Sequence, residues 1–221
     1  MTFQFNTVFE YWPMYLEGLR TTIYVTLGSL IFSLILSIPL AMIKITKNKI
    51  LNFIGFLYTD IFRALPSLVQ IYLVYFAAPQ LFGITFTAMT SAFITLSMNA
   101  AAYISEALRG GILSVDIGQR EAAKALGISL VDTLKDIVLP QALKAVFPSM
   151  INETIGLLKG TSLVSIIGVV DLMRASRQVM ADSYLSFEPL MVAAVIYYIL
   201  VKSMSMIGNR LEKRIRVSEI R

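Results

Sequence analysis

The sequence contains neither cysteine nor histidine. Without cysteine there is no disulfide framework, no thiolate nucleophile and no cysteine metal site. Without histidine, the commonest general base and the commonest metal ligand are both missing. No stretch fits the Walker pattern G-x-x-x-x-G-K-[ST], so the sequence has no phosphate loop of this type. We therefore expect no metal site and no cofactor bound by this chain, and any catalysis would have to depend on carboxylates.

Charge is scarce as well. Charged residues make up 15% of the 221 residues, against about 25% in a typical soluble domain, and 57% are hydrophobic. The 23 residues between Arg20 and Lys44 are uncharged, and so are the 42 between Arg63 and Glu106. Because a helix needs roughly 20 apolar residues to cross a bilayer, these runs predict one and two membrane helices. The runs are continuously apolar, without the alternation of barrel strands, so the predicted fold is an all-α membrane protein.

Five membrane spans are predicted along the chain. They cover approximately residues 22–43, 53–77, 86–107, 146–170 and 189–208. There is no linker that would separate domains, so residues 1–221 form one membrane domain. Aromatic and apolar residues recur every three or four positions before the first span, which predicts an interfacial helix within residues 1–20. A poorly ordered terminus is the alternative for this stretch.

Basic residues are distributed unevenly between the predicted loops. Of the 19 Lys and Arg, sixteen fall in segments 44–63, 109–159 and 202–221, and three fall elsewhere. Positive charge accumulates on the cytoplasmic side of membrane proteins, which predicts an outside N-terminus and a basic cytoplasmic tail at 209–221. The same bias explains the net charge of +5 and pI near 9.4 without a nucleic acid partner.

The longest polar segment, residues 109–144, separates the third and fourth spans. Strong helix formers fill 121–126, Gly127 can end that helix, and Ser129 can cap the next one. We expect two short helices at an angle on the cytoplasmic side. Their apolar residues favour insertion into a groove of a partner protein over the alternative of a solvated loop.

Several motifs of this chain resemble permeases of polar amino acid ABC importers. The pattern that resembles their EAA loop is Glu121-Ala122-Ala123, three residues, Gly127, nine residues, and then Ile137-Val138-Leu139-Pro140. Further similar stretches are RALPSLVQ at 63–70, NAAAY at 99–103 and KGTSL at 159–163. The resemblance covers about residues 10–215.

This resemblance implies a type I importer fold with five spans, located in the bacterial cytoplasmic membrane. It implies a dimer with a second permease subunit, identical or homologous, on a cytoplasmic ATPase dimer that binds ATP and Mg. An extracellular or periplasmic binding protein would deliver the amino acid. The residues implied in coupling to the ATPase are Glu121, Ala122, Ala123, Gly127, Leu139 and Pro140.

Polar residues near the expected membrane midplane are candidates for the substrate pathway. Carboxylates and amides could accept from the substrate ammonium, while lysine and hydroxyl groups could donate to its carboxylate. The candidate residues are Gln70, Asn99, Tyr103, Glu153, Lys159, Thr161 and Ser162, with Ser97 nearby in the same region. Gate pairs or hydrogen bonds between helices are the alternative role for several of them.

One position departs from the family pattern. Gly160 stands where many relatives have Asp or Glu after the lysine. A missing acid weakens the case for a cationic substrate, so a neutral or cystine-like amino acid is slightly favoured.

Two other functions are considered. A stand-alone ion-coupled carrier would not require an EAA loop, and a membrane enzyme would depend on Glu106 and Glu153, which stand alone in the sequence.

Overall fold

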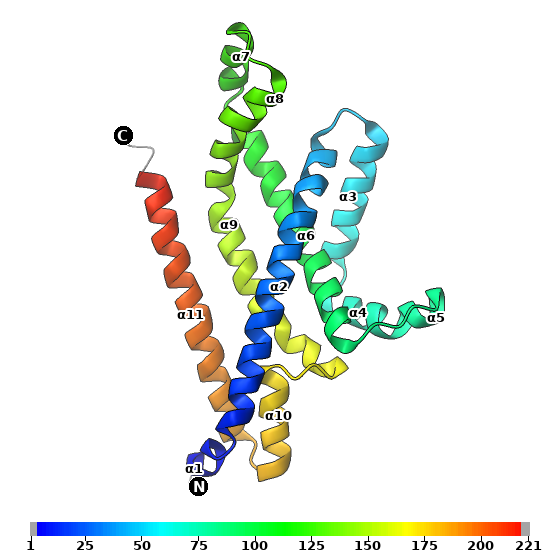
Figure 1. The fold of residues 1–221 in the computed structure, drawn as a ribbon, viewed down its shortest axis with the longest axis vertical. Coiled ribbons are helices and arrows are strands. Elements are labelled where there is room, and N and C mark those ends of the chain that lie inside the picture. The colour runs from blue at the N-terminus through cyan, green and yellow to red at the C-terminus, as the bar shows by residue number, and fades with distance from the viewer. Residues whose placement is uncertain (1–3, 218–221) are drawn as a thin grey trace.

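The computed structural model describes residues 4–217 and contains only helices and connections within that range (Figure 1). Residues 1–3 of the predicted interfacial helix and 218–221 of the predicted basic tail lie outside the described residues. The elements are α1 Phe5–Phe9, α2 Trp12–Ile45, α3 Lys49–Ala64, α4 Ser67–Tyr72, η1 Leu73–Ala77, α5 Ala78–Phe82, α6 Ala88–Ser114, α7 Ile117–Ala125, α8 Leu130–Asp132, η2 Thr133–Val138, α9 Leu139–Gly160, η3 Thr161–Ile167, α10 Leu172–Ser183 and α11 Phe187–Val217.

The sequence pattern predicted one interfacial helix within residues 1–20. In the structure, the described part of this stretch is divided between two helices. Only α1, Phe5–Phe9, stands apart, and α2 begins at Trp12 and continues without a break through the predicted first span. Pro13 lies in the first turn of α2, where a backbone N–H has no intrahelical acceptor, so the N–H that proline lacks costs no hydrogen bond. Because no helix breaker follows until Pro39, the amphipathic segment propagates into the span. Val8 and Tyr15 are buried, and Trp12 is exposed.

The predicted span 53–77 is not one continuous helix in the structure. Helix α3 ends at Ala64, and the chain bends by 105° before α4 begins at Ser67. The cause is Pro66, which disfavours helical geometry at the preceding residue; Leu65 is extended at φ −84° and ψ 136°. The helices α4, η1 and α5 therefore project sideways from the bundle (Figure 1).

Helix α6 forms the centre of the bundle, and its most extensive contacts are with α2 and α9. Most residues on the buried side of α2 are small, several of them polar, and they are spaced by three or four: Gly18, Thr22, Thr26, Ser29, Ser33, Ser37 and Ala41. Its outward side carries large exposed apolar residues such as Ile31 and Phe32. Small residues inside and large apolar ones outside are the arrangement of helices packed within lipid.

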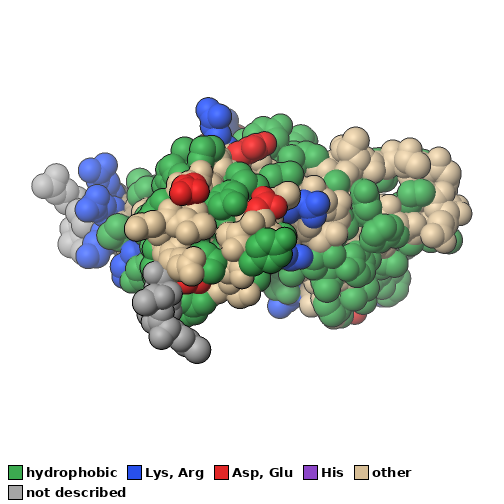
Figure 2. Space-filling model, turned by 90° about the horizontal axis from the view of Figure 1, so that it is seen from below, with side chains coloured by type: hydrophobic (Ala, Val, Ile, Leu, Met, Phe, Trp, Pro, Cys, Tyr) green, Lys and Arg blue, Asp and Glu red, His purple; other side chains and the backbone are tan. Residues whose placement is uncertain are grey.

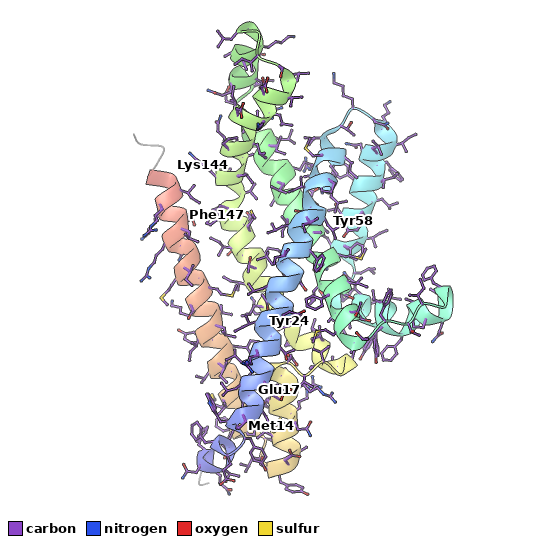
Figure 3. All side chains as sticks on the ribbon, viewed as in Figure 1. Met14, Glu17, Tyr24, Tyr58, Lys144 and Phe147 are labelled. Carbon is purple, nitrogen blue, oxygen red and sulfur yellow. The ribbon has the colours of Figure 1, made fainter. Side chains whose placement is uncertain are left out.

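The fourth predicted span, 146–170, begins earlier and changes geometry near its end. Helix α9 starts at Leu139 and gives way after Gly160 to the tighter helix η3. Gly168 turns the chain with φ 98° before α10, and the long helix α11 closes the fold. Figure 3 labels Tyr24 on α2, Tyr58 on α3, and Lys144 and Phe147 on α9.

By length and composition, α2 and α11 can each cross a membrane among the described residues. Up to four spans result if the bent pairs of 49–82 and of 130–183 each count as one. Helix α6 coincides with the predicted third span but carries many small polar residues along its buried side. Five spans and the orientation across the membrane remain predictions. The end opposite the α7–α8 region carries the N-terminus, and hydrophobic side chains cover much of it (Figures 1 and 2).

Candidate functional site

The helices α7 and α8 form a protruding tip at one end of the molecule (Figure 1). Asp116 caps α7 by accepting a hydrogen bond from the Gly118 amide at 2.6 Å. Arg120 donates from Nη2 to the Ile112 carbonyl oxygen near the end of α6. These two contacts fix the angle at which α7 leaves α6. The predicted coupling loop 109–144 is accordingly shorter, because Arg109–Ser114 continues α6 and the segment from Leu139 belongs to α9.

The turn after α7 has the geometry that the sequence predicted. Gly127 adopts φ +75°, the left-handed region that glycine reaches at little cost. Its amide donates to the Lys124 carbonyl at 3.1 Å, and the Ile128 amide donates to the Ala123 carbonyl at 3.0 Å. This pair of bonds is the Schellman arrangement that ends a helix. Ser129 then caps α8, accepting from the Asp132 amide at 3.1 Å.

Large apolar side chains are exposed on the surface of the tip. Leu126, Leu130 and Val131 are 79%, 85% and 73% exposed, so three large apolar side chains project away from the molecule. In the predicted coupling set, Glu121, Ala122 and Gly127 are exposed on α7 and its turn, and so are Leu139 and Pro140 at the start of α9. Ala123 is buried and contributes to the internal packing of the tip. A rigid, capped helix pair with an apolar surface is suited to occupy a groove on another protein.

Gln70 and Asn99 support the break between α3 and α4. Gln70 is buried and donates from its amide to the carbonyl oxygens of Phe62 and Leu65, at 2.8 and 2.9 Å. Asn99 of α6 donates to the same Phe62 carbonyl at 3.0 Å and to the Gln70 side-chain oxygen at 3.1 Å. These amides replace the helical donors that are lost at Pro66. The geometry thus gives Gln70 and Asn99 the alternative role considered for the candidate pathway residues, hydrogen bonding between helices.

The other predicted pathway residues do not converge on one site within the chain. Tyr103 lines a cleft between α3 and α6, whereas Lys159 and Ser162 line a cavity of about 370 Å³ with Tyr197. Thr161 is buried and donates to the Leu158 carbonyl at 2.7 Å. Glu153 is half-buried on α9, and within residues 4–217 no hydrogen bond or ion pair joins it. Tyr103, Glu153, Lys159 and Ser162 therefore remain reachable from outside the chain.

Sequence reasoning missed an ionic network where the end of α2 packs against α3 and α6. Lys44 was expected in a loop, yet it is buried at the end of α2. Its ammonium donates to Thr59 at 2.9 Å, to Ser105 at 2.7 Å and to the Glu106 carboxylate at 2.7 Å. Arg109 donates to the other Glu106 oxygen at 3.0 Å. Glu106 therefore does not stand alone, which removes it from the residues available to a membrane enzyme.

Sequence reasoning also missed Asp171. It is buried at the N-terminus of α10, where it accepts from the Arg174 and Met173 amides at 3.0 and 3.2 Å. The Tyr197 hydroxyl of α11 also contacts it, at 3.3 Å. The spacing of Asp171 before Arg174 is an N-cap signal that could have identified it.

Comparisons with known proteins agree with this geometry. Residues 33–217 match the family described as binding-protein-dependent transport system inner membrane component. A putative glutamine transport system permease protein of Rickettsia bellii is 44% identical over 91% of this chain and 93% of its own length. The arginine transport system permease protein ArtQ of Bacillus subtilis is 39% identical over 99% of this chain and all of its own.

Solved structures give the same result. The crystal structure of an amino acid ABC transporter with histidines superposes with a TM-score of 0.91 and 32% identity, over 97% of this chain and 100% of that one. An inward-facing structure of the MetNI methionine ABC transporter shares the fold, with a TM-score of 0.79 and 20% identity. A stand-alone ion-coupled carrier is not supported by these matches. The chain belongs to the family of binding-protein-dependent transport system inner membrane components.

Proposed function

We propose that this chain is the permease subunit of an ABC importer that moves a polar amino acid across the bacterial cytoplasmic membrane. The observation that carries the proposal is the α7–α8 tip, a capped helix pair that presents Leu126, Leu130 and Val131 to the outside. Exposed apolar side chains on a rigid protrusion, far from the lipid-facing sides of α2 and α11, require a protein partner. The names of the relatives supply the transport class.

The partner at the tip is a cytoplasmic ATPase dimer, which binds ATP and Mg and carries out hydrolysis. A second permease subunit, the same chain or a homologue, completes the membrane part, and a binding protein delivers substrate on the other side. The chain contributes five spans with its N-terminus outside. It performs no bond chemistry itself.

ATP binding drives the two ATPases together, and the tips move with them. The permease dimer then opens outward to receive the amino acid. ATP can shift this equilibrium only if the tip makes different contacts in the two states. Gly127 and Ser129 keep the helix pair rigid, so that displacement of the ATPase reaches α6 and α9 directly. Glu121, Ala122, Leu139 and Pro140 form the surrounding contact surface, with Ala123 as internal support.

The substrate is a polar amino acid, with neutral or cystine-like molecules favoured over cationic ones because Gly160 brings no acid to the pathway. One relative is named for glutamine, which is neutral, and another for arginine, which is cationic, so the transport of both kinds of amino acid has to be compared directly. Tyr103, Glu153, Lys159 and Ser162 are the predicted pathway residues that face accessible space. Gln70, Asn99 and Thr161 support the pathway from behind through their hydrogen bonds.

Affinity purification of the tagged chain from its native membrane tests the assembly. A co-purifying ATPase is expected, and the presence or absence of a second permease distinguishes a heterodimer from a homodimer. Vesicles containing the purified complex and its binding protein should then show ATP-dependent uptake, stronger for glutamine or cystine than for arginine. Isolation without any ATPase, in a detergent that preserves such complexes, would overturn the proposal. Arginine uptake equal to that of glutamine would remove the preference for neutral substrates.

Two tip variants test the coupling role. Gly127→Asp and Glu121→Lys are expected to insert normally but to lose the link between ATPase activity and uptake. The matched control is Lys47→Glu, an exposed charge change in the α2–α3 connection at the same end of the molecule. Stimulated ATPase and uptake that remain at wild-type levels in both tip variants would contradict a docking role for α7.

A further inference from the structure

A charged cleft lies between α3 and α6, beside the break that ends α3. It has a volume of about 440 Å³ and is lined by Phe56, Thr59, Asp60, Arg63, Tyr103 and Glu106. Asp60 and Arg63 are 11 and 14 residues from Lys49, the start of α3, which places them roughly 16 and 21 Å along the helix. Both charges therefore lie about three and four turns along α3, inside the predicted span 53–77.

The two outer charges of this cleft, Asp60 and Arg63, have no hydrogen-bond or ion-pair partner within the described residues. Lys44 and Arg109 neutralise Glu106, with ion pairs of 2.7 and 3.0 Å. Within residues 4–217 neither Asp60 nor Arg63 makes a hydrogen bond or an ion pair, although they are three residues apart on one helix and both exposed. An unpaired charge at this depth is costly, and such residues face a water-filled space or a ligand rather than lipid.

The Arg63 side chain is nevertheless held in position. Its guanidinium carbon lies 5.2 Å from the centre of the Tyr103 ring, a cation–π contact that leaves the guanidinium N–H groups available. A guanidinium can bind a carboxylate through two parallel hydrogen bonds. The carboxylate of Asp60, one helical turn away, can accept from an ammonium group.

We propose that this cleft binds the zwitterionic head group of the transported amino acid: Arg63 binds its α-carboxylate and Asp60 its α-ammonium. The inference rests on the proposed transport function and adds a site that lies apart from the Lys159–Ser162 cavity. One free cation and one free anion in a single cleft complement a neutral zwitterion better than an anion or a cation. Recognition through the head group leaves the substrate side chain to be selected elsewhere.

The test is amino acid binding to the purified permease–ATPase complex in nanodiscs, without the binding protein. The probes are radiolabelled glutamine, arginine, histidine and cystine. The wild-type complex should bind at least one of them saturably. Arg63→Gln and Asp60→Asn should each weaken that binding about tenfold or more, the range expected when a hydrogen bond to a charged group is lost. Lys47→Gln, an exposed control outside the cleft, should bind as the wild type does.

Ligand analogues separate a binding role from a structural one. The wild type should reject the α-amide of the bound amino acid, which lacks the carboxylate, and Arg63→Gln should reduce that discrimination. Binding of the intact amino acid at wild-type affinity by both variants would overturn the proposal, as would no saturable binding by the wild type. In either case ATP-dependent uptake by the wild type would leave the proposed function intact.

A second permease subunit is the rival occupant of the cleft. If Asp60 of one subunit paired with Arg63 of the other, the single variants would dissociate the dimer. The exchanged variant Asp60→Arg/Arg63→Asp would then restore both the dimer and uptake. That rescue would contradict the head-group site. A stable dimer in both single variants, together with weaker amino acid binding, would support it.

Discussion

The seam, where the small residues of α2 pack against α6, and the tip formed by α7 and α8 both reverse the residue distribution of a soluble protein, but for different reasons. In the seam, small and polar side chains are buried while large apolar ones face outward from α2. At the tip, apolar side chains such as Leu130 are exposed among charged neighbours. Lipid explains the first pattern, and the proposed ATPase partner explains the second. Substitutions in the seam should therefore cost stability, and substitutions at the tip should cost coupling.

The largest loss of stability is expected from Lys44→Met. The change removes three hydrogen bonds and leaves the Glu106 carboxylate with Arg109 alone, at a cost of about 3 kcal/mol or more. The unfolding midpoint of the detergent-purified chain is the measurement. Lys47→Met, three residues along and exposed, is the control. Adding Glu106→Gln to Lys44→Met should recover part of the loss. A Lys44→Met variant as stable as the control would show that the network is dispensable.

Gly111→Ala should destabilise by about 1–3 kcal/mol, as overpacking does. A Cβ at Gly111 would lie 2.9 Å from the Ala142 carbonyl oxygen and in contact with the Val146 side chain, where α6 approaches α9. The neighbouring Gly110 faces open space, so Gly110→Ala should leave stability unchanged or raise it by up to ~1 kcal/mol. Thermal unfolding of the two variants in parallel gives the comparison. Equal midpoints would mean that α6 and α9 separate at no cost.

Gln70→Leu should cost a similar or slightly smaller amount, about 1–2 kcal/mol, because the Phe62 and Leu65 carbonyls lose a donor. Asn99 still reaches the Phe62 carbonyl and limits the loss. Gln141→Leu, on an exposed part of α9, should change stability by less than about 0.5 kcal/mol. Protease sensitivity near Pro66 offers a local readout. A Gln70→Leu variant with unchanged unfolding and cleavage would refute its role in supporting the break.

Leu130→Asp should have the smallest effect on stability, within about 0.5 kcal/mol, since the side chain is 85% exposed. The same change should abolish retention of the ATPase on the tagged chain, because a charge enters an apolar contact. Ile31→Asp on the outward side of α2 should do the reverse: it should impair membrane insertion by about 2–3 kcal/mol and leave the tip intact. Retention of the ATPase by Leu130→Asp would break the comparison between seam and tip.

The sequence was sufficient for features that depend on local chemistry. The helix end at Gly127, the cap at Ser129 and the apolar runs of α2 and α11 follow from residue types at fixed spacings, and the structure has all of them. The break at Pro66 was also written in the sequence, but the uninterrupted apolar run around it favoured a continuous span. There the conformational restriction by proline outweighed the hydrophobic pattern.

Contacts between distant residues could not be predicted in the same way. Lys44 is 62 residues from Glu106, so its burial depends on how α2 packs against α6. Gln70 and Asn99 were named as candidates for the substrate pathway, and their hydrogen bonds to the Phe62 carbonyl could not be predicted from the sequence. Within the described residues, the lack of an ion pair at Asp60 and Arg63 likewise depends on how the bundle packs.

The absence of cysteine makes one measurement especially direct. Leu130→Cys and Ile31→Cys each create a single thiol, one on the tip and one on the outward side of α2, which can carry a photoactivated crosslinker. In native membranes, the account predicts that the label at position 130 crosslinks to the ATPase and that the label at position 31 does not. A label at position 130 that reaches no ATPase, or that reaches it no more often than position 31 does, would contradict the central claim that the tip docks the ATPase.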